Sequence, residues 1–112
     1  MKEITFQEFL EVELRIGTII KVQDFPEAKK PSYKLEVDFW EEIWIKKSSS
    51  QLKTMYTKEE LLWKQVLWVI NFPKKQIANF ISECLITGFV QNNWDVVIAI
   101  PDKKVPNGMK LL

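Results

Sequence analysis

Apolar and polar residues alternate along several stretches of this chain, which is the spacing of half-buried β-strands. In residues 33–39 the apolar Tyr33, Leu35 and Val37 alternate with Lys34 and Glu36. Elsewhere the strand signal is a short apolar run that is rich in β-branched and aromatic residues and ends at Pro or Asn. These patterns predict strands at residues 15–24, 33–39, 43–47, 66–72, 80–87 and 95–100, and a short final strand at 109–112. Gly17, inside the first of them, predicts a bulge or a sharp coil of the strand.

Two short segments carry helical signals instead. Phe6, Phe9 and Leu10 recur at helical spacing, and Thr5 with Glu8 forms the pattern of a capping box. This predicts an amphipathic helix within residues 5–14 that closes one end of the domain. Thr57 predicts a cap for one helical turn at residues 58–62. A mainly β chain with at least five strands, an N-terminal helix and a short mid-chain helix fits the OB-fold, a five-stranded Greek-key barrel.

The composition fits one small domain spanning residues 1–112. Apolar residues make up 46% of the chain and charged residues 28%, which suffices for a core and a solvated surface. Because the net charge is only +1, binding to nucleic acid would require a local basic patch. The single Cys84 excludes an internal disulfide and suits a reducing compartment. With no signal-peptide pattern and no apolar run near the ~20 residues of a membrane span, we expect a cytoplasmic protein without membrane insertion.

Several kinds of chemistry are excluded by residues that the chain lacks. There is no histidine and only one cysteine, so neither a thiolate or imidazole zinc site nor a Ser-His or Cys-His pair can form. Three glycines cannot build a glycine-rich phosphate loop. We therefore expect a binding protein that is not an enzyme and uses no metal or cofactor.

The most informative stretch runs from residue 66 to residue 87. Two apolar runs flank a short link around Pro73 that gathers amides and lysines at one rim of the predicted sheet. Amides pair with base edges or peptide groups, and lysines meet phosphate. The alternative interpretation is an ordinary strand connection whose Asn side chains bond their own backbone. The candidate binding residues here are Asn71, Lys74, Lys75, Gln76 and Asn79.

A second candidate segment follows the predicted strand at residues 43–47. Its side chains could donate to phosphate and sugar oxygens, or the segment could simply lead into a helix capped by a serine. The candidates are Lys46, Lys47, Ser48, Ser49 and Gln51, together with Ser82 from the strand at residues 80–87. Next to Ser82, Glu83 lies among apolar residues and needs a partner, which we expect to be Lys46, Arg15 or a ligand amide.

Other lysines could extend this surface if the fold brings them together. Lys29, Lys30 and Lys34 lie around the first long loop, and Lys103 and Lys104 lie near the C-terminus. Runs of charge usually mark solvated surface, and the sequence does not show whether these lysines converge.

A series of short blocks in fixed order resembles a known family. The blocks are residues 14–19 (LRIGTI), 25–28 (FPEA), 34–39 (KLEVDF), 45–49 (IKKSS), 71–73 (NFP), 76–80 (QIANF), 82–83 (SE) and 105–108 (VPNG). Together they resemble the tRNA-binding OB domain that occurs in trans-acting tRNA-binding proteins and is appended to several aminoacyl-tRNA synthetases. Within that family the chain is most similar to the bacterial CsaA group.

The resemblance implies a homodimer that binds tRNA through the barrel face, with the N-terminal helix and the C-terminal segment near the dimer interface. For the CsaA group it also implies a peptide-binding groove, so a chaperone for unfolded or exported polypeptides is the alternative function. A third alternative is an interaction domain that delivers a synthetase or another enzyme without binding nucleic acid itself. Binding to tRNA should weaken steeply with salt, whereas peptide binding should change little.

The five tryptophans depart from the family pattern. The resemblance implies glycine or another small residue at Trp40, Trp44, Trp63, Trp68 and Trp94. A chain of this length would average about 8 glycines, whereas this one has 3 glycines and 5 tryptophans. Either the tryptophans are genuine and the barrel has adapted to them, or the gene uses UGA as a glycine codon.

Overall fold

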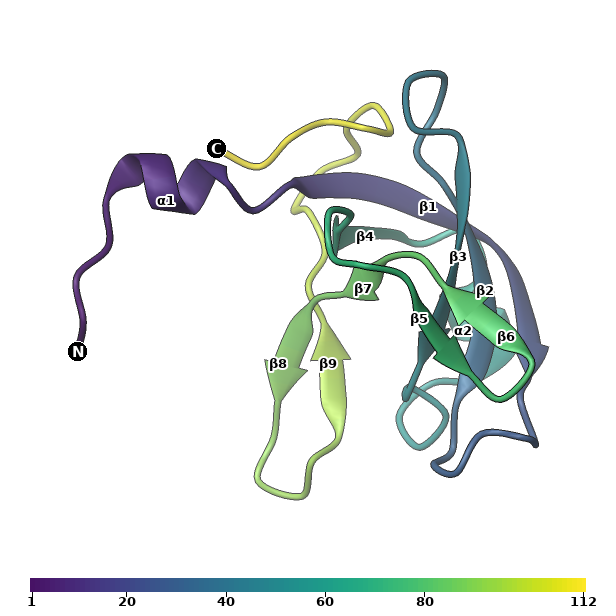
Figure 1. The fold of residues 1–112 in the computed structure, drawn as a ribbon. Coiled ribbons are helices and arrows are strands. Elements are labelled where there is room, and N and C mark those ends of the chain that lie inside the picture. Colours follow the sequence, from purple (N-terminus) through teal and green to yellow (C-terminus); the bar gives the residue numbers. More distant parts are fainter.

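In a computed structural model that describes residues 1–112, five antiparallel strands curve into a nearly closed barrel (Figure 1). Their order across the sheet is β3-β2-β1-β4-β7. The strands are β1 (Leu14–Asp24), β2 (Tyr33–Asp38), β3 (Ile45–Ser50), β4 (Gln65–Val69) and β7 (Leu85–Ile86). The mainly β fold with a five-stranded OB-type barrel is therefore confirmed.

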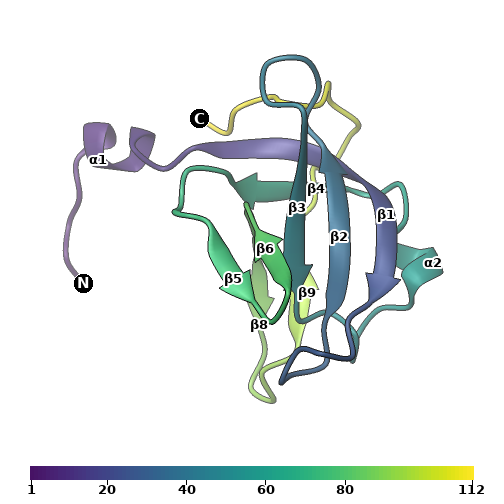
Figure 2. The same ribbon diagram turned by 45° about the vertical axis from the view of Figure 1, so that its right-hand side comes forward.

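Two hairpins extend from this barrel. One pairs β5 (Lys75–Ile77) with β6 (Phe80–Ser82), and the other pairs β8 (Gly88–Val90) with β9 (Val96–Ile98). Figure 2 shows the β5–β6 hairpin beside β3. In Figure 1 the β8–β9 hairpin extends below the barrel. The sequence patterns did not predict β5 or β8, because each spans only three residues and has no apolar run of its own.

Two irregular segments add backbone hydrogen bonds to the barrel, one along the first half of the central strand β1 and one at the edge strand β3. Near the C-terminus, Gly108 N–H donates to Ile16 O at 2.7 Å, and Leu111 N–H donates to Leu14 O at 2.9 Å. The predicted final strand at residues 109–112 is thus only an isolated bridge between Arg15 and Lys110. At the β3 edge of the sheet, Glu83 N–H donates to Lys47 O at 2.7 Å, which joins the chain after β6 to β3.

The interior of the barrel is filled mainly by aliphatic and aromatic side chains. Trp68 of β4 is fully buried, lies edge-on to Phe39 with 6.3 Å between ring centroids, and donates its indole N–H to Gly17 O at 3.2 Å. The rest of the buried cluster comprises Ile19, Tyr33, Leu35, Val37, Leu52, Leu61, Val66, Cys84 and Ile98. The alternation in β2 is confirmed, since Tyr33, Leu35 and Val37 all point into this core.

Gly17 has a different role from the predicted bulge. The register of β1 against β2 shifts between Ile19 and Lys21, three residues away from the expected place. At Gly17 a Cβ atom would lie 2.6 Å from both Phe39 Cε1 and Val37 Cγ1. Glycine is therefore required here for close packing against the core, and the bulge arises further along the strand.

Both predicted helices are present, each with a capping box, as α1 (Phe6–Leu10) and α2 (Lys58–Leu61). Their bounds are shorter than the predicted 5–14 and 58–62. Helix α1 does not close an end of the barrel, because it projects away from it (Figures 1 and 2) and buries none of its residues. Neither helix has the length and apolar character needed to cross a membrane.

The predicted strands also differ from the observed ones at their ends. β3 continues to Ser50 rather than stopping at residue 47. The predicted strand at residues 80–87 is divided into β6 and β7. The reason is that Glu83 Oε1 takes the Lys47 N–H at 3.0 Å, so a side chain replaces the backbone carbonyl that a continuous ladder would use.

Candidate nucleic-acid interface

The β5–β6 hairpin is held against β3 by polar side chains. Ser49 N–H donates to Ser82 Oγ at 3.1 Å, and Lys47 N–H donates to Glu83 Oε1 at 3.0 Å. The partner of Glu83 is therefore a backbone amide of β3, with Lys74 Nζ 3.7 Å from its other oxygen. The expected partners Lys46 and Arg15 do not contact it. These contacts hold the hairpin against the strand, and two hollows lie along β5.

The larger space is a hollow of about 620 Å³ between the loop at residues 27–32, the end of β3 and the hairpin. Three lysines border it: Lys29 and Lys30 from the loop, and Lys75 from β5. None of the three forms an ion pair within the protein, and Glu27 is the one acidic residue in the lining. The other lining residues are Ala28, Ser32, Ser49, Gln51, Gln76, Ile77 and Ala78.

An aromatic pair with two cations lies between β2, β3 and β6. Phe25 and Phe80 meet edge to face with 5.6 Å between centroids. Lys34 Nζ lies 5.4 Å from the Phe25 centroid, and Lys47 Nζ lies 5.5 Å from that of Phe80. Cation–π attraction of this kind holds an ammonium group without neutralising it. Both ammonium groups therefore remain able to meet an anion.

A smaller hollow of about 230 Å³ lies next to the larger one. Its walls include the apolar Phe72, Ile77 and Leu85 and the hydroxyl-bearing Ser82. Because Ser49, Gln51, Lys75 and Ile77 line both hollows, the two spaces are neighbours along β5. We call the two hollows together, with Lys34 and Lys47, the basic groove.

The structure brings together part of the predicted site. Ser49, Gln51, Lys75 and Gln76 line the larger hollow. Ser82 lines the smaller one, and Lys47 lies over Phe80 beside them. Lys74 is exposed and is paired with Glu83, and Asn79 is exposed at the turn between β5 and β6.

Three predicted residues have other surroundings. Ser48 is fully buried and donates its hydroxyl to Cys84 O at 2.8 Å, so its side chain cannot reach a ligand. Lys46 is half-buried, and its pairing with Val37 places it on the inward-facing register of β3. Asn71 is bound to the N-terminal segment. We therefore leave Ser48, Lys46 and Asn71 out of the proposed interface.

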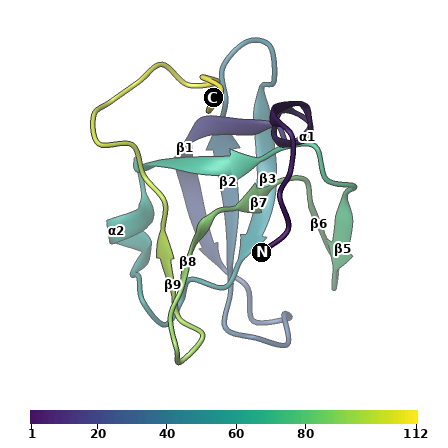
Figure 3. The ribbon, with the colours of Figure 1, turned by 90° about the vertical axis from the view of Figure 1, so that its left-hand side faces the viewer.

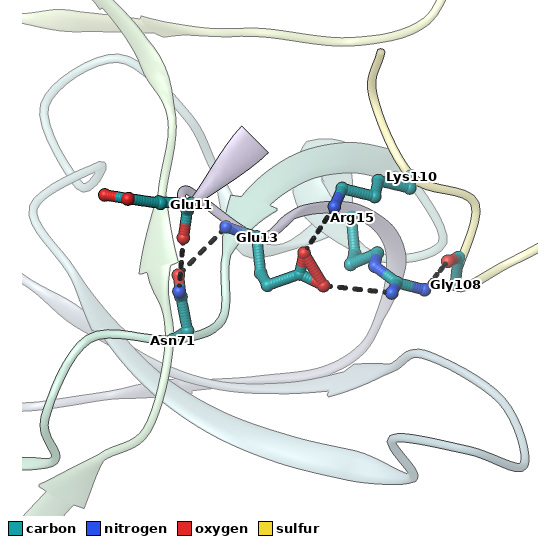
Figure 4. Close-up of polar contacts among 6 residues, drawn as sticks. All are labelled: Glu11, Glu13, Arg15, Asn71, Gly108 and Lys110. Carbon is teal, nitrogen blue, oxygen red and sulfur yellow. Dashed lines mark hydrogen bonds and ion pairs between the residues drawn. The ribbon is translucent and has the colours of Figure 1, made fainter. Parts of the chain in front are cut away.

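Asn71 belongs to a network that fixes the N-terminal segment to the barrel (Figure 4). Its side-chain oxygen accepts from Glu13 N–H at 2.9 Å, and its amide nitrogen donates to Glu11 O at 2.7 Å. The Glu13 carboxylate in turn pairs with Lys110 at 2.7 Å and Arg15 at 3.1 Å. These hydrogen bonds and ion pairs hold the pKa of Glu13 below its usual value.

The sequence analysis did not include the two lysines of the loop at residues 27–32 among its candidate binding residues. The run of Lys29 and Lys30 was visible in the sequence, but only the fold places these side chains opposite Lys75. Lys103 and Lys104 do not join them. They line a separate hollow with Lys64, in the C-terminal segment that lies on the opposite side of the barrel from β5 and β6 (Figure 3).

Cys84 offers no reactive thiol at this surface. Burial raises the pKa of its thiol to about 12, so the group stays protonated and is a poor metal ligand or nucleophile. No group of three or more His, Cys, Asp or Glu side chains is arranged to hold a metal ion.

The chain is similar to known proteins over most of its length. The family model described as "Putative tRNA binding domain" matches residues 14–110. The methionine–tRNA ligase of Pyrococcus furiosus is 35% identical over 111 residues, which cover 99% of this chain and 15% of the ligase. The chain thus spans about 15% of the length of that curated relative.

Two solved structures match nearly the whole chain. The crystal structure of the chaperone CsaA from Bacillus anthracis has a TM-score of 0.92 at 40% identity and covers 99% of this chain and 100% of its own. The CsaA chaperone protein from Picrophilus torridus has a TM-score of 0.90 at 44% identity, covering 98% of this chain and 100% of its own.

Proposed function

Since the chain belongs to the tRNA-binding domain family, we propose that it binds tRNA in the basic groove and that it does so as a homodimer. The observation that carries this proposal is the convergence of unpaired lysines from separate segments on one hollow. Lys29, Lys30 and Lys75 would meet phosphates, while Gln51 and Gln76 would bond sugar or base edges. The proposed activity is binding without catalysis.

The aromatic pair supports the same site. Phe80 is half-buried and carries Lys47 over its ring, and Lys34 lies between the two rings. Single-stranded nucleic acid is commonly bound by an aromatic surface next to a positively charged track. We propose that unstacked nucleotides of a tRNA lie across this pair, with their phosphates toward the loop lysines.

The homodimer is supported by apolar surface that the single chain leaves uncovered. Helix α1 buries no residue, and Ile4 and Phe6 are 61% and 60% exposed. A separate hollow of about 310 Å³ is lined mainly by apolar residues, among them Ile16, Leu67 and Met109. A helix of one turn is not stable alone in water, so we propose that a second copy covers α1.

The test is binding of bulk tRNA to the purified protein at two salt concentrations. We expect affinity to fall steeply as salt rises, because each neutralised phosphate releases counterions. Lys29→Glu with Lys75→Glu should weaken binding at least tenfold. The matched control, Lys103→Glu with Lys104→Glu, makes the same change of charge on the opposite side and should have little effect.

Equal loss in both double variants would mean that only net charge matters, and the basic groove would be rejected as the site. An unfolded peptide run in parallel tests the alternative function suggested by the CsaA chaperones. Peptide binding that is insensitive to salt, with no binding of tRNA, would replace the proposal.

A further inference from the structure

Four of the five tryptophans have backbone angles that tryptophan rarely adopts. The φ angles are 73° at Trp40, 66° at Trp44, 73° at Trp63 and 70° at Trp94. This left-handed region is open to glycine, but a side chain's Cβ crowds the backbone there, and for a bulky residue the angle is a genuine outlier. Among all the other non-glycine residues of the chain, only Ala78 has a positive φ.

Each of these residues takes part in a backbone hydrogen bond of its turn or helix end. In the turn between β2 and β3, Trp44 N–H donates to Trp40 O at 2.7 Å, and Phe39 N–H donates to Trp44 O at 3.1 Å. In the turn between β8 and β9, Trp94 N–H donates to Gln91 O at 2.9 Å. Left-handed residues complete hairpin turns of this type, and glycine usually supplies them.

Trp63 stands at a helix end, where the same argument holds. Leu62 is the C-cap of α2, and Trp63 is the next residue, the position at which helices commonly end with a left-handed glycine. Its N–H donates to Ile19 O at 2.7 Å, so the backbone is tied to β1. Rotating Trp63 to a relaxed φ would break that link.

The four indole side chains form no aromatic pair or hydrogen bond that would offset this strain. They are 61%, 70%, 67% and 82% exposed at Trp40, Trp44, Trp63 and Trp94. None of the four takes part in an aromatic pair, and no hydrogen bond uses one of their indole N–H groups. If these positions are glycines, this one assignment explains the backbone angles, the deficit of glycine and the excess of tryptophan in the composition.

We propose that the native protein carries glycine at positions 40, 44, 63 and 94, because its gene is read with UGA as a glycine codon. Trp68 is not assigned, since its backbone is ordinary strand and its indole fills the core. Under this proposal the exposed tryptophans have no part in stacking on RNA, and the loops that carry them turn without strain.

The direct test is peptide mass spectrometry on the protein purified from the organism that carries the gene. We expect peptides spanning the four positions to have the masses of their glycine forms, and the four codons to be UGA. Tryptophan-containing peptides at these positions, or UGG codons, would overturn the proposal.

A comparison of recombinant proteins tests the physical argument independently. Replacing Trp40, Trp44, Trp63 and Trp94 together by glycine should raise the thermal unfolding midpoint above that of the same four-fold replacement by alanine. The alanine protein is the matched control, because it removes the indoles but keeps the Cβ strain. Equal midpoints for the two proteins would contradict the assignment of these backbones to glycine.

Discussion

Single residues in the serine run after Lys47 have opposite roles. The alternation of a strand continues through Ser48, Ser49 and Ser50, so Ser48 and Ser50 are buried while Ser49 lines the basic groove. Sequence reasoning ended this strand at residue 47 because serine has no strong strand preference. Pairing with β2 extends it, and only that pairing distinguishes the buried serines from the exposed one.

We therefore expect Ser48→Ala and Ser49→Ala to separate stability from binding. Removing the Ser48 hydroxyl takes away the 2.8 Å donor of the buried Cys84 carbonyl and leaves it only the long 3.5 Å hydrogen bond from Ser82 Oγ, which should cost about 1 kcal/mol of unfolding free energy. Ser49→Ala should change stability by less than about 0.5 kcal/mol and weaken tRNA binding. Denaturant titrations and binding curves measure both effects, and weaker binding by correctly folded Ser48→Ala would contradict this division.

The lowered pKa of Glu13 predicts how acid affects the attachment of α1 to the barrel. The hydrogen bond from Lys110, and then that from Arg15, favour the charged carboxylate. A carboxyl group whose folded pKa is depressed stabilises the fold above its usual value of 4.5 and loses this contribution as the pH falls through the folded value. Attachment of residues 5–13 should thus be constant from pH 7 to pH ~5 and loosen below pH ~4.

Hydrogen exchange of the amides at residues 5–13, corrected for the intrinsic effect of pH, measures this attachment. In Glu13→Gln the exchange should be faster near neutral pH and should no longer change on acidification. An unchanged profile in that variant would show that Glu13 is not the titrating group.

Among the elements, α1 shows most clearly what local sequence decides. Thr5 and Glu8 determine where the helix starts, so its existence was predictable from residues 5–10 alone. Its direction was not, because that depends on Asn71, which lies 58 residues beyond Glu13 in the chain. The sequence predicts Asn71 as a ligand-binding amide, but its side-chain oxygen and nitrogen instead bind the backbone of the segment that follows α1.

We expect Asn71→Ala to free the helix without altering the basic groove. Two hydrogen bonds to the backbone at residues 11 and 13 are lost, so hydrogen exchange of the amides at residues 5–13 should accelerate. A dimer should also be weaker and dissociate at a higher protein concentration. Asn79→Ala is the matched control, since Asn79 is an exposed asparagine of the same stretch whose side chain forms no hydrogen bond within the protein. Similar hydrogen exchange in both variants would show that Asn71 does not hold the N-terminal segment against the barrel.

At the scale of the whole molecule, the barrel was predictable and the groove was not. Alternation in β2 and the apolar run of β4 determine which faces are buried, and burial largely determines the sheet. The groove depends on where the loop at residues 27–32 meets the β5–β6 hairpin. Neither has a periodic pattern, so lysines that are similar in sequence separate into Lys29, Lys30 and Lys75 on one side and Lys103 and Lys104 on the other.

The last prediction concerns what a second copy adds to RNA binding. If α1 joins two barrels, one tRNA can meet two grooves, and the number of neutralised phosphates should be about twice that of one barrel. Deleting residues 1–12 should give a monomer by light scattering, with the slope of log affinity against log salt falling to about half. Phe6→Ser with Phe9→Ser should act in the same direction while keeping the chain length. A slope that is unchanged in a proven monomer would mean that each barrel binds tRNA by itself, and the dimer would then have no role in recognition.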